Sequence, residues 1–255
     1  MKHSPLDQRM KSMEQFGQLR LPPEGWAVVR ADGRGFSRLT EQRFQKPFDP
    51  RFHEAMVAAA RAMLEELSGL YAYTESDEIS LLLPRDNSFF SGRLEKLVSV
   101  AAGIASATFT HHIGAPAHFD ARVWLGPSEE AVVDYFRWRQ ADALRCSLNG
   151  WCYWTLRQAG QSAGQATAAL DGRTFDEKRA LLERHGVQLD ALPGWQRQGV
   201  GLYPETFLKR GFDPRSREEV FVARRRVRVE ETLPTGDAYA RFLTPLLSPS
   251  VADRP

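Results

Sequence analysis

The chain has 255 residues, of which 34 are lysine or arginine and 32 are aspartate or glutamate, so its formal net charge is only +2. A hydrophobic share of 42% permits a full core, and the length suits one large domain or a domain with a substantial extension. The two cysteines, Cys146 and Cys152, exclude a disulfide framework and a zinc-ligand pattern. The longest mostly apolar stretch, 98–109, is too short to span a bilayer, and the N-terminus lacks a signal-peptide core, so we expect a soluble cytoplasmic protein without a membrane partner.

The first predicted strand leads directly to an acidic residue. Residues 26–32, WAVVRAD, form a short apolar and β-branched run that follows two prolines and ends at a glycine-rich segment. Asp32 is therefore expected where the strand gives way to a loop. A helix is predicted over 53–67, because HEAMVAAARAMLEEL places apolar residues at helical spacing among strong helix formers.

The following segments continue an alternation of strands and helices. Two apolar runs at 70–74 and 79–83 are split by the acidic segment 75–78, which indicates a hairpin. A second helix over 94–109 and a fourth strand over 117–125 come next. This order is that of the ferredoxin-like βαββαβ unit, so the predicted fold class is α+β.

The topology predicts that two distant carboxylates meet. The first and third strands are antiparallel neighbours in a ferredoxin-like sheet, so Asp32 at the end of one lies beside Asp77 at the start of the other. Two carboxylates this close repel each other unless one is protonated or a cation binds both. Such oxygen ligands suit Mg²⁺, and two-metal sites of this kind serve displacement at phosphorus. Taken singly, Asp-Gly and Ser-Asp are also ordinary turn residues.

Residues near the carboxylates have the chemistry of a nucleotide site. Gly33 and Gly35 allow the backbone to approach an anion closely, and successive backbone N–H groups form a natural phosphate cradle. Lys46 suits a triphosphate as a point charge, although a solvated loop lysine explains it equally well.

Two further charged residues flank this segment. Arg30 leaves the first strand on the same face as Asp32, so it could reach a phosphate or neutralise that carboxylate. Glu78 follows Asp77 directly and would point to the other face of a regular strand, so it could only support the site from behind.

The C-terminal half offers weaker signals. Residues 132–156 are predicted as a long helix, whose Trp151, Tyr153 and Trp154 are expected in the core because large aromatics are usually buried in part. The β-like run FVARRRVRVE carries four arginines between Arg224 and Arg228, a basic edge that could meet nucleic-acid phosphates. An exposed strand that uses charge against aggregation explains the same arginines.

Five segments in this order resemble the tRNA-His guanylyltransferase family and its 3′-to-5′ polymerase relatives. They are DGRGF at 32–36, the Lys46-Pro47 pair in FQKPFDP, SDE at 76–78, FDARVWLGPS from Phe119 and DYFRWRQAD from Asp134. The resemblance covers roughly residues 26–203. It implies a polymerase-type palm domain with an N-terminal extension over 1–126, and a helical and β-rich extension over 127–255 packed on the palm as one compact unit.

The resemblance also implies an activity and a set of site residues. The activity is metal-dependent addition of nucleotides in the 3′-to-5′ direction to tRNA 5′ ends, with a two-metal Mg²⁺ site and with ATP and GTP as substrates. The positions that match catalytic carboxylates and metal ligands are Asp32, Asp77 and the Gly33 carbonyl. The positions that match nucleotide contacts are Gly33, Arg34, Gly35, Phe36, Ser37, Lys46, Ser76 and Asp77. Supporting or phosphate contacts are suggested for Arg30, Glu78, Arg122, Arg139 and Lys178.

One position departs from the family pattern. Dedicated guanylyltransferases carry the run HINNLYN after the WRQAD segment, whereas this chain has Leu144 at the histidine position. The departure favours the prokaryotic 3′-to-5′ polymerase branch and templated repair of truncated tRNA 5′ ends. The alternatives are a dedicated tRNA-His guanylyltransferase, a palm-fold nucleotidyl cyclase and a non-catalytic RNA-binding module. The family also suggests a homotetramer, since its members bind tRNA across subunits.

Overall fold

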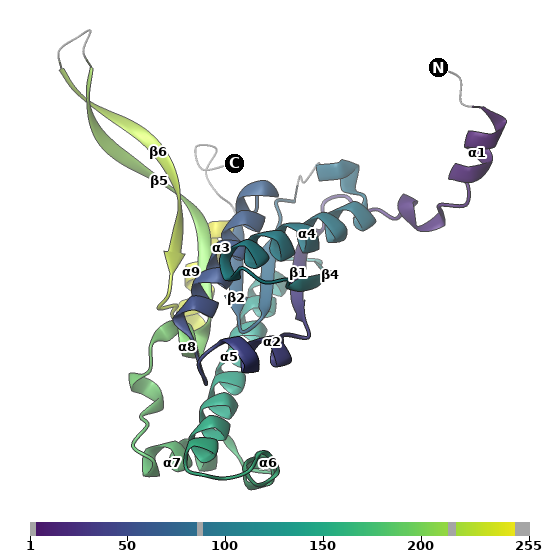
Figure 1. Ribbon diagram of the computed structural model, residues 1–255. Coiled ribbons are helices and arrows are strands. Elements are labelled where there is room, and N and C mark those ends of the chain that lie inside the picture. The colour runs from purple at the N-terminus through teal and green to yellow at the C-terminus, as the bar shows by residue number, and fades with distance from the viewer. Residues whose placement is uncertain (1–3, 86–88, 214–217, 248–255) are drawn as a thin grey trace.

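The computed structural model describes residues 4–85, 89–213 and 218–247 (Figure 1). Six strands form one antiparallel sheet in the order β4-β1-β3-β2-β5-β6. The ferredoxin-like unit consists of β1 (Trp26–Arg34), α2 (Phe36–Arg43), α3 (Pro50–Glu66), β2 (Tyr71–Glu75), β3 (Glu78–Leu82), α4 (Leu94–Ile113) and β4 (His118–Gly126). The α+β prediction and its βαββαβ order are confirmed.

The remaining elements flank this unit in the chain. Before it come α1 (Pro5–Lys11) and the 3-10 turn η1 (Gln15–Gln18), and η2 (Phe89–Gly92) lies inside it. After it come α5 (Glu129–Gln158), α6 (Ala163–Leu170), α7 (Phe175–Arg184), η3 (Leu189–Ala191), α8 (Gly194–Gln198), β5 (Val200–Asp213), β6 (Glu218–Glu230) and α9 (Gly236–Leu247). In the described ranges, no helix combines the length and the apolar character needed to cross a membrane.

Helices α3 and α4 cover one face of the sheet. The core on this side joins alternate residues of β1, such as Val29 and Ala31, to the apolar stripes of both helices. Helix α3 begins where Asp49 caps it, since the Asp49 carboxylate accepts a hydrogen bond from the Arg51 amide at 2.8 Å, and Pro50 suits the first helical position. This side therefore fixes β1 and the loop that precedes α3 relative to each other.

Helices α5 and α9 cover the other face. Val28 of β1 packs there with Tyr135 and Phe136 of α5 and with Tyr239 of α9. Because side chains alternate along a strand, Arg30 and Asp32 share this second face with Val28. The polar end of β1 thus lies on the side of the sheet that α5 covers.

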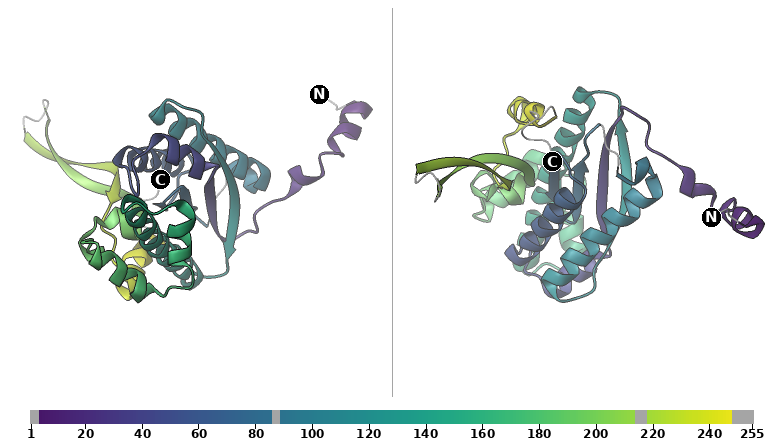
Figure 2. Two further views of the ribbon diagram at one scale, coloured as in Figure 1. Left: turned by 60° about the horizontal axis from the view of Figure 1, so that its bottom comes forward. Right: turned by 90° about the horizontal axis from the view of Figure 1, so that it is seen from above.

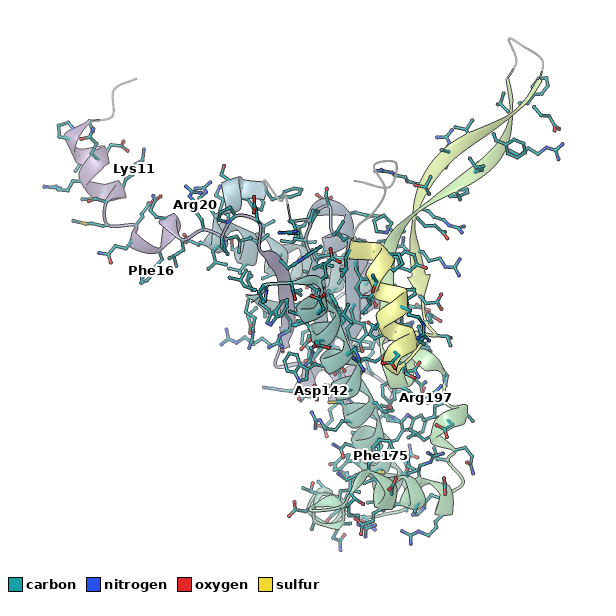
Figure 3. All side chains as sticks on the ribbon, turned by 180° about the vertical axis from the view of Figure 1, so that it is seen from behind. Lys11, Phe16, Arg20, Asp142, Phe175 and Arg197 are labelled. Carbon is teal, nitrogen blue, oxygen red and sulfur yellow. The ribbon has the colours of Figure 1, made fainter. Side chains whose placement is uncertain are left out.

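The C-terminal half of α5 extends away from the sheet and carries a second, smaller core. Leu148, Cys152 and Leu156 of α5 pack there with apolar residues of α6 and α7. We call this the distal unit. Figure 1 shows α6 and α7 at the end of α5 far from the strands, and Figure 3 shows Phe175 in this unit, well below Asp142.

Two segments project from the body. The β5–β6 hairpin pairs from Gly201 with Glu230 to Asp213 with Glu218, and its outer part leaves the sheet. In both views of Figure 2, this hairpin and the N-terminal segment extend from opposite sides of the molecule. Helix α1 has no buried residue, so it adds nothing to the core.

Candidate active site

Asp32 and Asp77 meet where β1 ends and β3 begins. Asp32 pairs with Glu78 in the β1–β3 register, and the Gly33 amide donates a hydrogen bond to the carbonyl oxygen of Asp77 at 3.0 Å. Burial raises the pKa of the Asp77 carboxyl, and the negative charge of Asp32 adds to that effect. The structure therefore brings together the two carboxylates that the topology predicts to be neighbours.

A strained turn presents Asp77. Ser76 has a positive φ of 48°, a conformation that non-glycine residues rarely adopt. Its hydroxyl donates a hydrogen bond to Asp77 Oδ1 at 3.1 Å, which favours the charged carboxylate. The turn thus holds the Asp77 side chain in one orientation.

The glycine segment after Asp32 leads directly into α2. Gly35 has a positive φ of 73° and precedes Phe36, whose ring is only 2% exposed among the aromatic rings of Phe109 and Phe119. A Cβ at Gly33 would lie 2.5 Å from the Phe36 ring, so a side chain does not fit there. The buried Phe36 ring anchors the segment. The backbone around Gly35 and the exposed side chains of Arg34 and Ser37 remain available to a ligand.

Lys46 approaches this region from the loop between α2 and α3. Its ammonium donates a hydrogen bond to Thr40 Oγ1 at 2.7 Å and lies 5.8 Å from the centroid of the Trp154 ring. Burial lowers the pKa of Lys46, while the charges of Glu41 and Asp77 oppose that change. A partly desolvated cation whose charge interacts with Asp77 is well placed to bind a phosphate.

A buried carboxylate shapes the same loop. Asp49 accepts hydrogen bonds from the Gln45 amide at 2.8 Å and from Arg51 Nη2 at 2.7 Å. These bonds, that from the Arg51 side chain foremost, lower the pKa of Asp49 to about 2. Asp49 therefore stays charged and clamps the loop that carries Lys46.

A cavity of about 420 Å³ opens beside these residues, a size within the range of small-molecule sites. Its lining joins the acidic turn and α2 with parts of α3, α5 and α8 that are distant in the sequence. The predicted residues among its walls are Phe36, Ser37, Lys46, Ser76 and Asp77. Other residues that line it are Thr40, Glu41, Asp49, His53, Glu75, Tyr153, Trp154 and Trp195.

Arg139 lies behind the acidic turn in a buried ion-pair network. Its guanidinium donates to Glu78 at 2.7 Å, to Glu75 at 3.0 Å and to Asp142 at 3.0 Å. Burial, with the nearby charge of Glu78, raises the pKa of Glu75 to about 8, although Arg139 acts in the opposite direction. Three carboxylates thus occupy the Arg139 guanidinium, which here supports the turn.

The other charged residues suggested by the sequence lie in different surroundings. The Nε atom of Arg30 is 3.6 Å from Glu78 Oε2, so Arg30 faces this network. Arg122 on β4 pairs with Asp120 at 3.1 Å. Lys178 lies on α7 in the distal unit, and its carbonyl accepts from the Cys152 thiol. Lys178 is not among the residues that line the cavity.

The donor set near Asp32 and Asp77 limits the kind of metal site. In the part of the chain that the structure describes, there is no group of three or more His, Cys, Asp or Glu side chains that could hold a metal ion. Mg²⁺ is usually bound by one or two carboxylates, with water and substrate phosphate as the remaining ligands. Two carboxylates and a backbone oxygen suit this coordination better than that of a metal whose ligands all come from the protein. The residues present therefore fit Mg²⁺.

Sequence reasoning missed part of the cavity wall. Trp151 and Tyr153 pack against the distal core, as expected for large aromatics, and Tyr153 also lines the cavity. Trp154 lines the cavity as well but belongs to none of the described core clusters. Trp195 and Asp49 were not predicted either. The walls converge only through tertiary packing, so no local pattern identifies them.

A ferredoxin-like sheet with two carboxylates at the β1 and β3 ends defines a palm-fold protein. The family model for tRNAHis guanylyltransferase matches residues 7–127, and the model for the Thg1 C terminal domain matches residues 130–232. This chain belongs to the tRNAHis guanylyltransferase family.

Curated relatives agree with this assignment. The tRNA(His) guanylyltransferase of Neurospora crassa is 33% identical over 207 residues, which cover 75% of this chain and 71% of that protein. The tRNA(His) guanylyltransferase 2 of Arabidopsis thaliana is 32% identical over 196 residues, which cover 72% of this chain. The match spans only 36% of the length of that Arabidopsis protein.

Solved structures also resemble the fold. A bacterial tRNA(His) guanylyltransferase (Thg1)-like protein in complex with GTP superposes with a TM-score of 0.73 at 25% identity, covering 96% of this chain and 100% of the other. A structure of such a bacterial protein in complex with ATP gives a TM-score of 0.75 at the same identity and coverage.

Proposed function

We propose that this protein is a metal-dependent nucleotidyltransferase that adds nucleotides in the 3′-to-5′ direction to tRNA 5′ ends, with templated repair of truncated ends as its main reaction. The observation that carries the proposal is the meeting of Asp32 and Asp77 beside a cavity that also contains Lys46 and Ser76. Family membership supports the reaction class.

The carboxylates of Asp32 and Asp77 and the Gly33 carbonyl would hold Mg²⁺. When bound, Mg²⁺ supplies charge stabilisation at the reacting phosphorus. Burial is the main cause of the raised pKa of Asp77, and without a cation the negative charge of Asp32 raises it further. Ser76 contributes by fixing the Asp77 side chain for this task.

The cavity would take the nucleoside triphosphate. Lys46 meets the phosphates as a point charge, and exposed N–H groups at the start of α2 together with the Ser37 hydroxyl offer further donors. GTP and ATP are the expected substrates, in agreement with the complexes of bacterial relatives with these nucleotides. The 5′ monophosphate of the RNA would first attack the α-phosphorus of ATP, which releases pyrophosphate and leaves AMP in anhydride linkage to the RNA. The 3′-hydroxyl of the incoming nucleotide would then attack the RNA 5′ phosphorus, and AMP would leave as the anhydride bond breaks.

Contacts to tRNA are expected along β6. The arginines between Arg224 and Arg228 are exposed on the edge strand of the sheet. Glu205 pairs with Arg226 at 2.6 Å and lies 3.8 Å from Arg228, so part of this charge is neutralised within the hairpin. Counterion release from phosphates that bind to this edge would give salt-dependent binding. A homotetramer that binds tRNA across subunits is also proposed, and light scattering that reports a monomer would contradict it.

The surroundings of Leu144 favour repair over a reaction dedicated to tRNA-His. Leu144 packs against the apolar core of the distal unit. A leucine there cannot donate or accept the hydrogen bonds that a histidine would make.

The test uses two 5′-monophosphorylated transcripts, full-length tRNA-His and another tRNA that lacks its first nucleotide. Each is incubated with Mg²⁺, ATP and labelled GTP or the missing nucleotide. The proposal predicts extension mainly of the truncated tRNA. Preferential guanylation of tRNA-His would instead establish the dedicated reaction, and cyclic nucleotide formed from a triphosphate without RNA would establish a cyclase.

A further inference from the structure

Trp154 is an aromatic residue at the edge of the nucleotide cavity, where its ring contacts the Tyr153 ring at a centroid distance of 5.2 Å and the Arg157 guanidinium at 5.8 Å. It lies on α5, is only partly buried, and lines the cavity that contains Asp77. Its neighbours on the same helix, Trp151 and Tyr153, pack against the distal core, but Trp154 belongs to none of the described core clusters. A large aromatic ring that lines a cavity without joining a core is available to a ligand.

The ring lies close to the groups that would bind a triphosphate. Lys46 Nζ is 5.8 Å from the Trp154 ring centroid, and the Lys46 charge interacts with that of Asp77. A triphosphate bound by Lys46, with a cation between its phosphates and Asp77, would therefore place its nucleoside in the same cavity. The volume of about 420 Å³ accommodates a ligand of this class.

The cavity wall around Trp154 suits a planar, uncharged group. Phe44, Phe48, Tyr153 and Trp195 also line it, so the lining is rich in aromatic rings. Nucleic-acid bases stack on such rings with little preference among bases, because every base has a π face.

We propose that Trp154 binds the base of the nucleoside triphosphate by stacking, and thereby contributes to binding GTP and ATP alike. The inference deepens the proposed function, on which it rests. Its chemistry is base-tolerant, so Trp154 increases affinity without selecting the nucleotide, and selection is left to pairing with an RNA template.

A different role for Trp154 would follow from its contact with Lys46. A cation over an aromatic ring is stabilised. In this alternative, Trp154 positions the Lys46 ammonium and does not contact the base. The two roles differ in one measurable respect. Stacking requires a base, whereas positioning of Lys46 affects every ligand that carries the phosphates.

The experiment measures binding of GTP, ATP and inorganic tripolyphosphate to the full chain with Mg²⁺ by calorimetry. Trp154→Leu removes the aromatic ring and keeps an apolar side chain. Phe175→Leu is the control, because it also replaces an aromatic ring by leucine, and Phe175 is 41% exposed on α7 of the distal unit and does not line the cavity. We expect Trp154→Leu to weaken GTP and ATP by about tenfold and to leave tripolyphosphate and the control unchanged.

Three results would overturn the inference. Equal weakening of all three ligands would assign Trp154 to positioning Lys46, an unchanged GTP affinity would exclude any role, and weakening of GTP alone would make Trp154 a selector. If Trp154→Leu fails to fold, Trp154→Phe keeps a ring, and partial weakening of both nucleotides without a change for tripolyphosphate is then expected.

The design separates this inference from the proposed function. Binding is measured without RNA, so a protein that binds GTP through Trp154 but extends no tRNA would contradict the proposed function alone. Asp77→Asn should weaken all three ligands, because it removes a charge that holds the metal. If Asp77→Asn still binds GTP tightly and Trp154→Leu does not, the base binds at Trp154 but Asp77 does not belong to the catalytic site.

Discussion

The Gly33 amide donates a hydrogen bond to the carbonyl oxygen of Asp77 at 3.0 Å and thereby ties the end of β1 to the turn that begins β3. The residue before Gly33 is Asp32, so the backbone itself holds the two acidic segments side by side. A side chain at Gly33 would collide with Phe36, which explains why the link passes through glycine. The pair of carboxylates is thus preorganised by β-sheet geometry.

Lys46 should contribute to nucleotide binding. Lys46→Met removes the only charge of that side chain while keeping most of its volume, and the loss of a charge-assisted contact should raise the KM for GTP by roughly 10- to 100-fold. Steady-state kinetics at saturating RNA measure this. Lys96→Met, an exposed change on α4 outside the cavity lining, serves as the control, and equal kinetics for both variants would remove Lys46 from the site.

Arg139 should be required for stability. Arg139→Met leaves Glu75 and Glu78 buried without their partner, a change that costs about 3–5 kcal/mol of unfolding free energy. Arg145→Ala removes an arginine that also pairs with Asp142, but its side chain is 64% exposed, so the loss should stay below about 1 kcal/mol. Denaturant unfolding compares the two. Similar losses would mean that the buried network adds no more than a surface pair.

Glu75 should make stability depend on pH. Its pKa is about 8 in the folded protein against 4.5 as the ordinary value, so the folded state holds a proton that the unfolded state releases. Stability from this group is therefore lost as pH rises between those two values. Glu75→Gln keeps an acceptor for Arg139 but does not titrate. The melting temperature should decrease from pH 6 to pH 9 by more in the wild type than in Glu75→Gln. An equal decrease in both proteins would show that the pKa of Glu75 is not raised.

The hairpin arginines should act through RNA phosphates. Arg224→Ala should weaken tRNA binding and lower the slope of log affinity against log salt by about 1, since each lost phosphate contact lowers it by about one. Arg210→Ala is the control from the same hairpin, because Glu219 already pairs with Arg210. A slope that does not change would favour the alternative in which charge protects an exposed edge strand.

The strands and helices of the ferredoxin-like unit could be predicted because their signals are local. A short apolar, β-branched run between prolines and glycines identifies β1, and helical spacing with strong helix formers identifies α3. Helix α2 was missed, since FSRLTEQR is mostly polar and shows no clear apolar stripe, and its helical state depends on Phe36 packing into the core. The length of the β5–β6 hairpin was missed because its exposed outer part lacks an alternating pattern.

Some residues of the candidate site could be predicted from the sequence, and others could not. Asp32 and Asp77 could be placed together from strand order, because a register between neighbouring strands fixes which residues meet. Trp154 and Asp49 could not be placed, since they enter the cavity through the packing of α5 and of the loop before α3. The aromatic composition of α5 suggested core residues: Trp151 and Tyr153 pack against the distal core, whereas Trp154 is partly buried and lines the cavity.

The most direct test of the central claim compares Mg²⁺-dependent nucleotide addition to a truncated, 5′-monophosphorylated tRNA by the wild type, Asp32→Asn and Asp77→Asn. Asp120→Asn is the matched control, because Asp120 pairs with Asp32 in the β1–β4 register but its carboxylate already binds Arg122. We expect a loss of at least about a hundredfold in both site variants, with melting temperatures retained and the control active. Addition that survives in Asp32→Asn or Asp77→Asn would contradict the assignment of these carboxylates to catalysis.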